Sequence, residues 1–139
     1  MTRTRYLVDT HIAIFLMNGS NELEKKIREF LEDCNNLVYV STISVQEMLY
    51  LQKQNKLKSI WKSPEDILKS IETNNFQLLP VKKEHLATFA GLSTPPDHHD
   101  PNDHMLISQA ITEKMCMVSS DKQFRNYSDK QFDLFFNHR

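Results

Sequence analysis

Short runs of β-forming residues alternate with longer helical segments along this chain, and that alternation restricts the fold more than any other feature. The runs rich in branched, aliphatic or aromatic residues are 4–8, 37–41, 76–81, 116–119 and 132–136. Between them, apolar residues recur three or four positions apart, as in amphipathic helices. Strands that alternate with helices form parallel sheets through right-handed crossovers. We therefore predict an α/β fold with a central, mostly parallel sheet flanked by helices on both faces.

The expected helices have recognisable ends. They cover residues 11–17, 21–34, 43–54, 83–92 and 104–115, with a further helix from Ser63-Pro64 to Asn74-Asn75 and a helical turn around Phe124. Gly19 can take the left-handed conformation that ends the first helix, and Asn21 with Glu24 fits a capping box at the second. Ser63 is a good cap, and Pro64 suits the first helical position.

The segment from residue 83 to residue 115 is expected to hold two helices around a loop. The inward face of helix 83–92 should consist of Leu86, Phe89 and Ala90. Residues 93–102 (STPPDHHDPN) contain three prolines and predict a loop. Asp103 is then expected to cap helix 104–115.

Length and charge limit the possible classes of protein. The 139 residues suit a single domain over residues 1–139 with one core. A net charge of -1 excludes a global basic surface for nucleic acid, so any such surface must be local. Cys34 and Cys116 lie in apolar periodic segments, so we expect free, buried thiols in a reducing compartment. The apolar run 12–17 is too short for a signal core or a membrane span, which favours a cytoplasmic protein without membrane contact.

Acidic residues follow two of the predicted strands. Asp9 comes directly after the first strand, and Asp121 comes shortly after the fourth. Because ligands of open parallel sheets bind beyond the carboxyl ends of the strands, these side chains can meet at one edge. Glu47 lies early in the helix after the second strand, on the same side. The position of Asp103 depends on how the proline-rich loop folds.

Four carboxylates in one place repel one another unless a proton or a cation neutralises them. Oxygen ligands with open positions suit Mg²⁺ or Mn²⁺ and favour phosphoryl-transfer chemistry, whereas zinc normally recruits His or Cys. The sequence also leaves structural alternatives open: Asp103 and Asp121 as helix caps, and Glu47 in a capping box with Ser44. For Asp9, whose only structural task would be to cap the first helix, we favour a functional role.

Two other clusters have competing interpretations. His98, His99 and His104 surround two acids but lack the spacing of zinc ligands, so we expect surface residues and leave them out of the metal set. A basic stretch around Trp61 contains Lys53, Lys56, Lys58 and Lys62. Its lysines can follow a phosphate backbone while the indole stacks on a base, or the stretch can be a solvated loop or a protein-binding surface.

The order of these segments resembles the PIN-domain family, and specifically the VapC-type ribonuclease toxins of bacterial type II toxin–antitoxin systems. The resembling pieces are Leu7-Val8-Asp9-Thr10-His11, Val40-Ser41 through Ser44-Val45-Gln46-Glu47, His99-Asp100-Pro101-Asn102-Asp103 leading into Met105-Leu106-Ile107-Ser108-Gln109-Ala110, and Val118-Ser119-Ser120-Asp121 with Phe124. They cover nearly the whole chain. Carried onto it, the family's acidic site falls on Asp9, Glu47, Asp103 and Asp121, which would hold one or two Mg²⁺ or Mn²⁺ ions.

The resemblance implies more than the four acids. Thr10, Asp100 and Ser119 would be outer neighbours of the site, and the partners would be RNA, a cognate antitoxin and a second copy of the chain. In one place the sequence departs from the family. Asn102-Asp103-His104 stands where relatives often have Phe-Asp-Arg, so a fixed positive charge beside the acids is lost, and His104 replaces it only when protonated.

The function that we expect is metal-dependent endoribonucleolytic cleavage, with Asp9 and Asp103 as the principal ligands and the other two acids acting through water. A haloacid-dehalogenase-like phosphatase or a response-regulator receiver fits poorly, because Thr10-His11 follows Asp9 and the third strand ends in Pro80-Val81-Lys82. A catalytically silent PIN-like module that binds RNA or a protein is the remaining alternative, and the presence of all four acids argues against it.

Overall fold

The first strand of the chain lies at the centre of a five-stranded sheet in the computed structural model, which describes residues 3–57, 60–127 and 132–139. The strands are β1 (Arg5–Val8), β2 (Leu37–Ser41), β3 (Gln77–Leu79), β4 (Cys116–Ser119) and β5 (Leu134–Phe136). Their order is β3-β2-β1-β4-β5, and every neighbouring pair is parallel. The predicted fold class is therefore confirmed.

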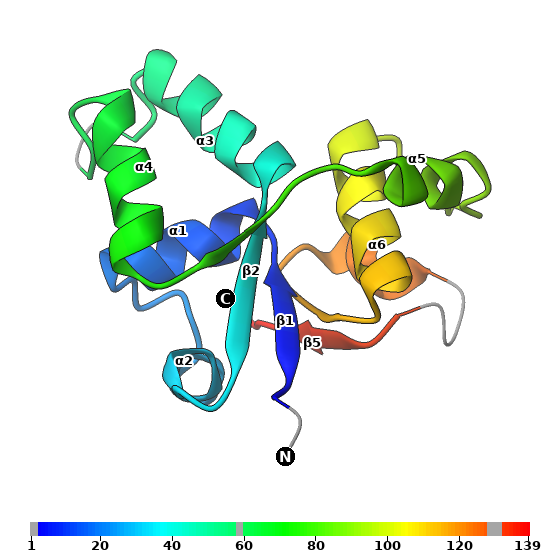
Figure 1. Ribbon diagram of the computed structural model, residues 1–139, viewed down its shortest axis with the longest axis horizontal. Coiled ribbons are helices and arrows are strands. Elements are labelled where there is room, and N and C mark those ends of the chain that lie inside the picture. Colours follow the sequence, from blue (N-terminus) through cyan, green and yellow to red (C-terminus); the bar gives the residue numbers. More distant parts are fainter. Residues whose placement is uncertain (1–2, 58–59, 128–131) are drawn as a thin grey trace.

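Helices cover both faces of this sheet (Figure 1). They are α1 (Thr10–Asn18), α2 (Lys25–Glu32), α3 (Thr42–Lys53), α4 (Pro64–Thr73), α5 (Lys83–Ala90), α6 (Pro101–Glu113) and the 3₁₀ helix η1 (Lys122–Asn126). One core joins α1 to α4 with Tyr6 and Val8 of β1, and the other joins α6 and η1 with Leu7. Neighbouring residues of β1 are thus both buried, as expected of a strand in a parallel sheet covered on both sides. No helix in the described ranges has the length and apolarity to cross a bilayer.

The strand order determines where a ligand can enter. From β1 the chain builds outward through β2 to β3, and it then returns to place β4 on the other side of β1. The connection after β1 therefore leads to β2 on one side, and the connection after β4 leads to β5 on the opposite side. Such a point of reversal opens a crevice beyond the carboxyl ends of the strands.

Two helix ends agree with the sequence prediction. Gly19 follows α1 with φ of 69°, a left-handed conformation that glycine adopts without steric cost. Ser63 precedes α4, and its hydroxyl accepts a hydrogen bond from the Asp66 N–H at 3.3 Å, with Pro64 at the first helical position. Local chemistry alone is sufficient to set these two boundaries.

The expected start of α2 is wrong, because a distant segment engages Glu24, the predicted partner of Asn21 in the capping box. α2 begins at Lys25 without a side-chain cap, and Asn21 does not form the capping box. The Glu24 carboxylate instead accepts a hydrogen bond from the His138 N–H at 2.9 Å. The Glu24 N–H donates to the Asn137 side chain at 2.7 Å. The carboxyl-terminal segment has therefore replaced the local capping interaction.

Two predictions about burial are also corrected. Cys34 is exposed, because α2 ends at Glu32 and the chain turns outward, while Cys116 is half-buried and burial raises its pKa to about 12. On α5 the inward residue is the fully buried His85, whereas Leu86 is 54% exposed. Phe89 is half-buried and Ala90 exposed. α5 packs on α6 rather than on the sheet, so a narrower face of it is covered than the apolar pattern indicates.

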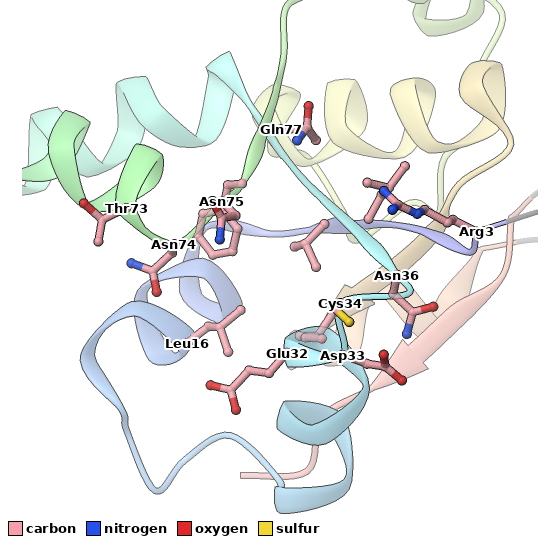
Figure 2. Close-up of a pocket in the computed structure, with 14 residues that line it drawn as sticks. Arg3, Leu16, Glu32, Asp33, Cys34, Asn36, Thr73, Asn74, Asn75 and Gln77 are labelled. Carbon is pink, nitrogen blue, oxygen red and sulfur yellow. The ribbon is translucent and has the colours of Figure 1, made fainter.

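A cavity of about 480 Å³ lies at the amino ends of β1, β2 and β3 (Figure 2). Arg3, Asn36 and Gln77 precede or begin these strands and line it. Cys34 lies at the same cavity, with Glu32 and Asp33 beside it. This cavity occupies the edge of the sheet opposite to the reversal of strand order.

Candidate active site

A cleft of about 510 Å³ opens at the carboxyl edge of the sheet, where β1 and β4 are neighbours. All four acids that the sequence singled out line this cleft, and they come from the end of β1, from α3, from α6 and from the segment after β4. The full lining is Asp9, Thr10, His11, Glu47, Asp100, Asp103, Ser120, Asp121, Lys122, Gln123 and Arg139. The strand order therefore brings acids from both ends of the sequence to one place.

Asp9 is the most buried of the four acids, at 7% exposed, because it follows β1 directly. Its N–H continues the sheet by donating to the Val118 carbonyl at 3.1 Å. One carboxylate oxygen accepts from the Ile12 N–H at 3.0 Å, which caps α1, and the other accepts from the Ser119 hydroxyl. Burial raises the pKa of the Asp9 carboxyl and the charge of Asp121 raises it further, although both hydrogen bonds oppose the rise. Asp9 thus has a capping role and is also fixed in the cleft.

Glu47 reaches the cleft from the middle of α3. Ser41 caps this helix by accepting a hydrogen bond from the Ile43 N–H at 3.1 Å, so the capping box of Glu47 with Ser44 is not formed. The Glu47 carboxylate instead accepts from the Thr10 hydroxyl at 2.8 Å. The residue that follows Asp9 is therefore hydrogen-bonded to Glu47.

Asp103 lies in the first turn of α6 rather than at its cap. Pro101 is the first helical residue, and Asp100 caps the helix by accepting from the Asn102 N–H at 2.9 Å. The expected capping role of Asp103 is therefore wrong. Burial raises the pKa of the Asp103 carboxyl to about 6, and the charge of Asp100 adds to the rise, while a hydrogen bond with His98 opposes it. No capping role therefore accounts for the place of Asp103 in the first turn, and burial disfavours its charged form.

Asp121 lies at the exposed mouth of the cleft. Its carboxylate caps η1 by accepting from the Gln123 N–H at 2.9 Å, so the capping alternative holds for this residue. Its own N–H donates to the Ser119 hydroxyl at 3.0 Å, and that hydroxyl in turn donates to Asp9. Ser119 therefore couples the acid after β1 to the acid after β4.

A guanidinium group that no sequence pattern indicated, that of Arg139, also lines the cleft. Arg139 lies 5.0 Å from the centroid of the Phe15 ring and pairs with Glu22 at 3.1 Å. The segment that carries it is fixed by Asn137, which is fully buried and donates to the Glu22 carbonyl at 2.8 Å. These contacts join residues more than a hundred positions apart, so no local pattern could have identified Arg139.

The basic stretch lies beside the cleft rather than in it. Lys53 shares an adjoining groove with Glu47. Lys56 and Lys62 are exposed, and Lys58 lies outside the described residues.

Two side chains expected at the surface are buried. Trp61 is 4% exposed and its indole N–H donates to the Ser70 hydroxyl at 2.9 Å, because α4 packs over it, so it cannot stack on a base. His98 is 3% exposed, in contact with Asp103 at 2.9 Å and with the Tyr127 hydroxyl at 2.7 Å. The prediction of a surface histidine is correct for His99 only.

The donor set determines which metal ion the cleft fits. Among the residues that the structure describes, no three or more His, Cys, Asp or Glu side chains converge closely enough to hold an ion as they stand. Mg²⁺ retains several waters and needs only one or two protein carboxylates, so it does not require such a set. Burial disfavours the charged forms of Asp9 and Asp103 and so raises their pKa values, and a bound divalent cation would favour those charged forms. The residues present therefore fit Mg²⁺ or Mn²⁺ better than zinc.

Comparison with known proteins identifies the family. The PIN domain family model matches residues 6–130. VapBC2 from Rickettsia felis bound to a DNA fragment from its promoter has a chain of similar fold, with a TM-score of 0.71 and 18% identity over 96% of this chain and 98% of that one. A chain of DNA-bound VapBC from Salmonella typhimurium is also similar in fold, with a TM-score of 0.70 and 17% identity over 97% of this chain and 99% of that one. No curated protein sequence matches significantly. Because the family match covers most of the sequence, this chain belongs to the PIN domain family.

Proposed function

We propose that this chain is a metal-dependent endoribonuclease and the toxin of a type II toxin–antitoxin pair. The observation that carries the proposal is the convergence of Asp9, Glu47, Asp103 and Asp121 on one cleft of a PIN domain. Carboxylates with raised pKa values gather at sites that bind cations or move protons more often than elsewhere on a protein. This cleft lies at the point of the sheet where ligands of open α/β folds bind.

Each acid would have its own task at this site. Asp9 and Asp103 would be the principal ligands of one or two Mg²⁺ or Mn²⁺ ions, because both are held by hydrogen bonds and both carry unfavourable negative charge. Glu47 and Asp121 would act through water, Glu47 held by Thr10 and Asp121 at the mouth. The bound cation would supply an activated water and neutralise charge that develops on the phosphate.

Basic groups at the rim would orient the RNA. Lys122 and Arg139 line the same cleft as the acids, and Lys53 lies in the adjoining groove. Cations on one side of an acidic site can fix a phosphate backbone while the acids bind the metal. We extend this role to the rest of the basic stretch, Lys56, Lys58 and Lys62.

A cognate antitoxin and a second copy of the chain are the protein partners that we propose. Solved structures of similar fold are described as VapBC complexes, which supports a cognate antitoxin as the partner of this chain. Such a partner would cover the cleft and prevent RNA from entering. We also propose a homodimer, as implied by the resemblance to VapC-type toxins.

The test is cleavage of end-labelled RNA by the purified chain with Mg²⁺ or Mn²⁺, and again after chelation by EDTA. Asp9→Asn should lower the rate by more than about 100-fold. Removing an outer partner of a metal ligand costs about 10- to 100-fold, and removing a ligand itself should cost more. The fold should survive, because Asn caps a helix as well as Asp does. Asp97→Asn is the matched control, since Asp97 is an exposed loop acid outside the cleft lining. Metal-dependent cleavage by Asp9→Asn at the wild-type rate would overturn the assignment.

One competing function is a catalytically silent PIN-like module that only binds RNA or a protein, and the four acids that line the cleft argue against it. The same assay separates the two functions. Binding of RNA by the wild type without cleavage, at any Mg²⁺ or Mn²⁺ concentration, would establish the silent module. Metal-dependent cleavage that Asp9→Asn removes would exclude it.

A further inference from the structure

His98 is a buried histidine whose ring contacts one of the four acids of the cleft. It lies in the loop between α5 and α6 and is 3% exposed. The Phe124 ring lies 5.7 Å away and the Tyr127 ring 5.5 Å away, centroid to centroid. Its carbonyl accepts a hydrogen bond from the His104 ring at 2.7 Å. The imidazole is therefore held in one orientation by groups on several sides.

The hydrogen-bond directions around this imidazole follow from its partners. A carboxylate that binds a cation can only accept hydrogen bonds, so in that state Nε2–H of His98 donates to Oδ2 of Asp103 at 2.9 Å. In a neutral ring Nδ1 is then the acceptor, and the Tyr127 hydroxyl donates to it at 2.7 Å. Tyr127 keeps its proton, because burial and the nearby acids raise its pKa. Tyr127, His98 and Asp103 thus form a directed chain that ends at the cleft.

This chain leaves one oxygen of Asp103 for the cleft. Oδ2 is engaged by His98, and within the described part of the chain no hydrogen bond to Oδ1 is found. Asp103 itself lines the cleft. A carboxylate held by one oxygen can present the other in a fixed direction, and outer partners of this kind tune metal affinity.

We propose that His98, oriented by Tyr127, is a positioning residue that aims the free oxygen of Asp103 at a divalent cation in the cleft. The inference rests on the metal-binding part of the proposed function. His98 touches neither cation nor RNA, so its effect must pass through Asp103. A residue that only anchored the loop would change stability and leave metal affinity unaltered.

The experiment measures Mn²⁺ affinity of the purified chain without RNA, by isothermal titration calorimetry. His98→Leu should weaken binding by about 10- to 100-fold, the usual cost of losing an outer partner. His98→Gln should restore most of the affinity, because its amide can donate to Asp103 and accept from Tyr127. Tyr127→Phe should give an intermediate loss, because the imidazole then keeps only one of its two ring partners.

The matched control is His85→Leu. His85 is a second buried histidine, and it pairs with Glu113, which lies on the same helix, α6, as Asp103. This substitution should lower the melting temperature and leave Mn²⁺ affinity unchanged. Wild-type affinity in His98→Leu, or equal losses in His98→Gln and His98→Leu, would overturn the inference alone. A wild-type chain that binds no Mn²⁺ would instead refute the metal site, and the role of His98 with it.

Discussion

The two ends of α6 carry the same interaction in different surroundings. Near the start of the helix, buried His98 contacts Asp103 at 2.9 Å, and at its end buried His85 contacts Glu113 at 2.7 Å. In both pairs the second ring nitrogen has a fixed partner, a phenol hydroxyl in the first and a backbone N–H in the second. The pairs differ in what surrounds the carboxylate.

Glu113 lies at the amino edge of the sheet, where its carbonyl accepts a hydrogen bond from Arg5 at the start of β1. The cavity at this edge (Figure 2) is almost as large as the acidic cleft, about 480 Å³ against about 510 Å³. Asp103 instead shares the carboxyl edge with the other acids of the cleft. The pair of His85 with Glu113 thus holds α5 against α6 at the amino edge of the sheet. The pair of His98 with Asp103 instead holds a carboxylate close to other acids.

The largest expected difference between the two ends is in RNA cleavage. Asp103→Asn should lower the rate by more than about 100-fold, because the amide is a poor ligand for a divalent cation. Glu113→Gln should cleave at close to the wild-type rate but lose about 1 kcal/mol of stability, since a charge-assisted hydrogen bond becomes a neutral one. Cleavage assays and urea unfolding of both variants provide the check. Equal losses of cleavage would show that the two pairs do not differ in function.

Metal removal should separate the two ends in stability. Mg²⁺ at about 100 times its dissociation constant should raise the free energy of unfolding of the wild type by about 2.7 kcal/mol, and EDTA should reverse this. The metal-dependent gain should disappear in Asp103→Asn and persist in Glu113→Gln. Thermal unfolding with and without Mg²⁺ measures it. An undiminished gain in Asp103→Asn would remove this acid from the ligand set.

A smaller effect of pH is expected in the absence of metal. The pKa of Asp103 in the folded state is about 6, above its ordinary value of 3.8, so the folded state holds this proton more tightly than the unfolded state. The stability that it contributes is present below about pH 4 and is lost as the pH rises through about 6. Urea unfolding in EDTA should therefore show wild type losing stability relative to Asp103→Asn over this range. A relative gain with rising pH would contradict the raised pKa.

The smallest effect concerns two arginines that lie over phenylalanine rings, one at the cleft and one outside it. Arg139 lies over Phe15 and lines the cleft, whereas Arg125 lies over Phe136, 4.1 Å from its centroid, outside the cleft lining. Arg139→Gln should weaken RNA binding and reduce the slope of log affinity against log salt by about 0.7, the value for one phosphate contact on a single strand. Arg125→Gln should leave the slope unchanged. Fluorescence anisotropy at several salt concentrations measures both.

Sequence periodicity was sufficient for the architecture of this domain but not for every boundary. The strands and most helices follow from residue types and spacing, because burial on both faces of a parallel sheet demands a recognisable apolar pattern. The start of α2 was wrong because Glu24 is engaged by Asn137 and His138, which lie at the far end of the chain. A capping rule that considers only neighbouring residues cannot predict that a distant segment will form hydrogen bonds with Glu24.

In the candidate site too, residues placed by local pattern were predicted, and residues placed by contacts with distant segments were not. Asp9 and Asp121 were predicted from their positions after strands, while Glu47 and Asp103 needed the resemblance to PIN domains. His98 and Arg139 were missed, because their places depend on contacts with segments distant in sequence. Arg139 also places a guanidinium at the cleft, where the resemblance to PIN domains had implied the loss of a fixed positive charge at His104.

The pairing of β1 with β4 also determines when the cleft can exist. Asp9 and Ser119 share a hydrogen bond across 110 positions of sequence. A ribosome releases Asp9 and Glu47 long before Asp103 and Asp121 emerge, and pairings between distant segments are slow to form. The cleft is therefore incomplete until Asp121 has left the ribosome and β4 has paired with β1. If the proposed function holds, a nascent chain that lacks Asp121 cannot cleave the RNA of the cell that is making it.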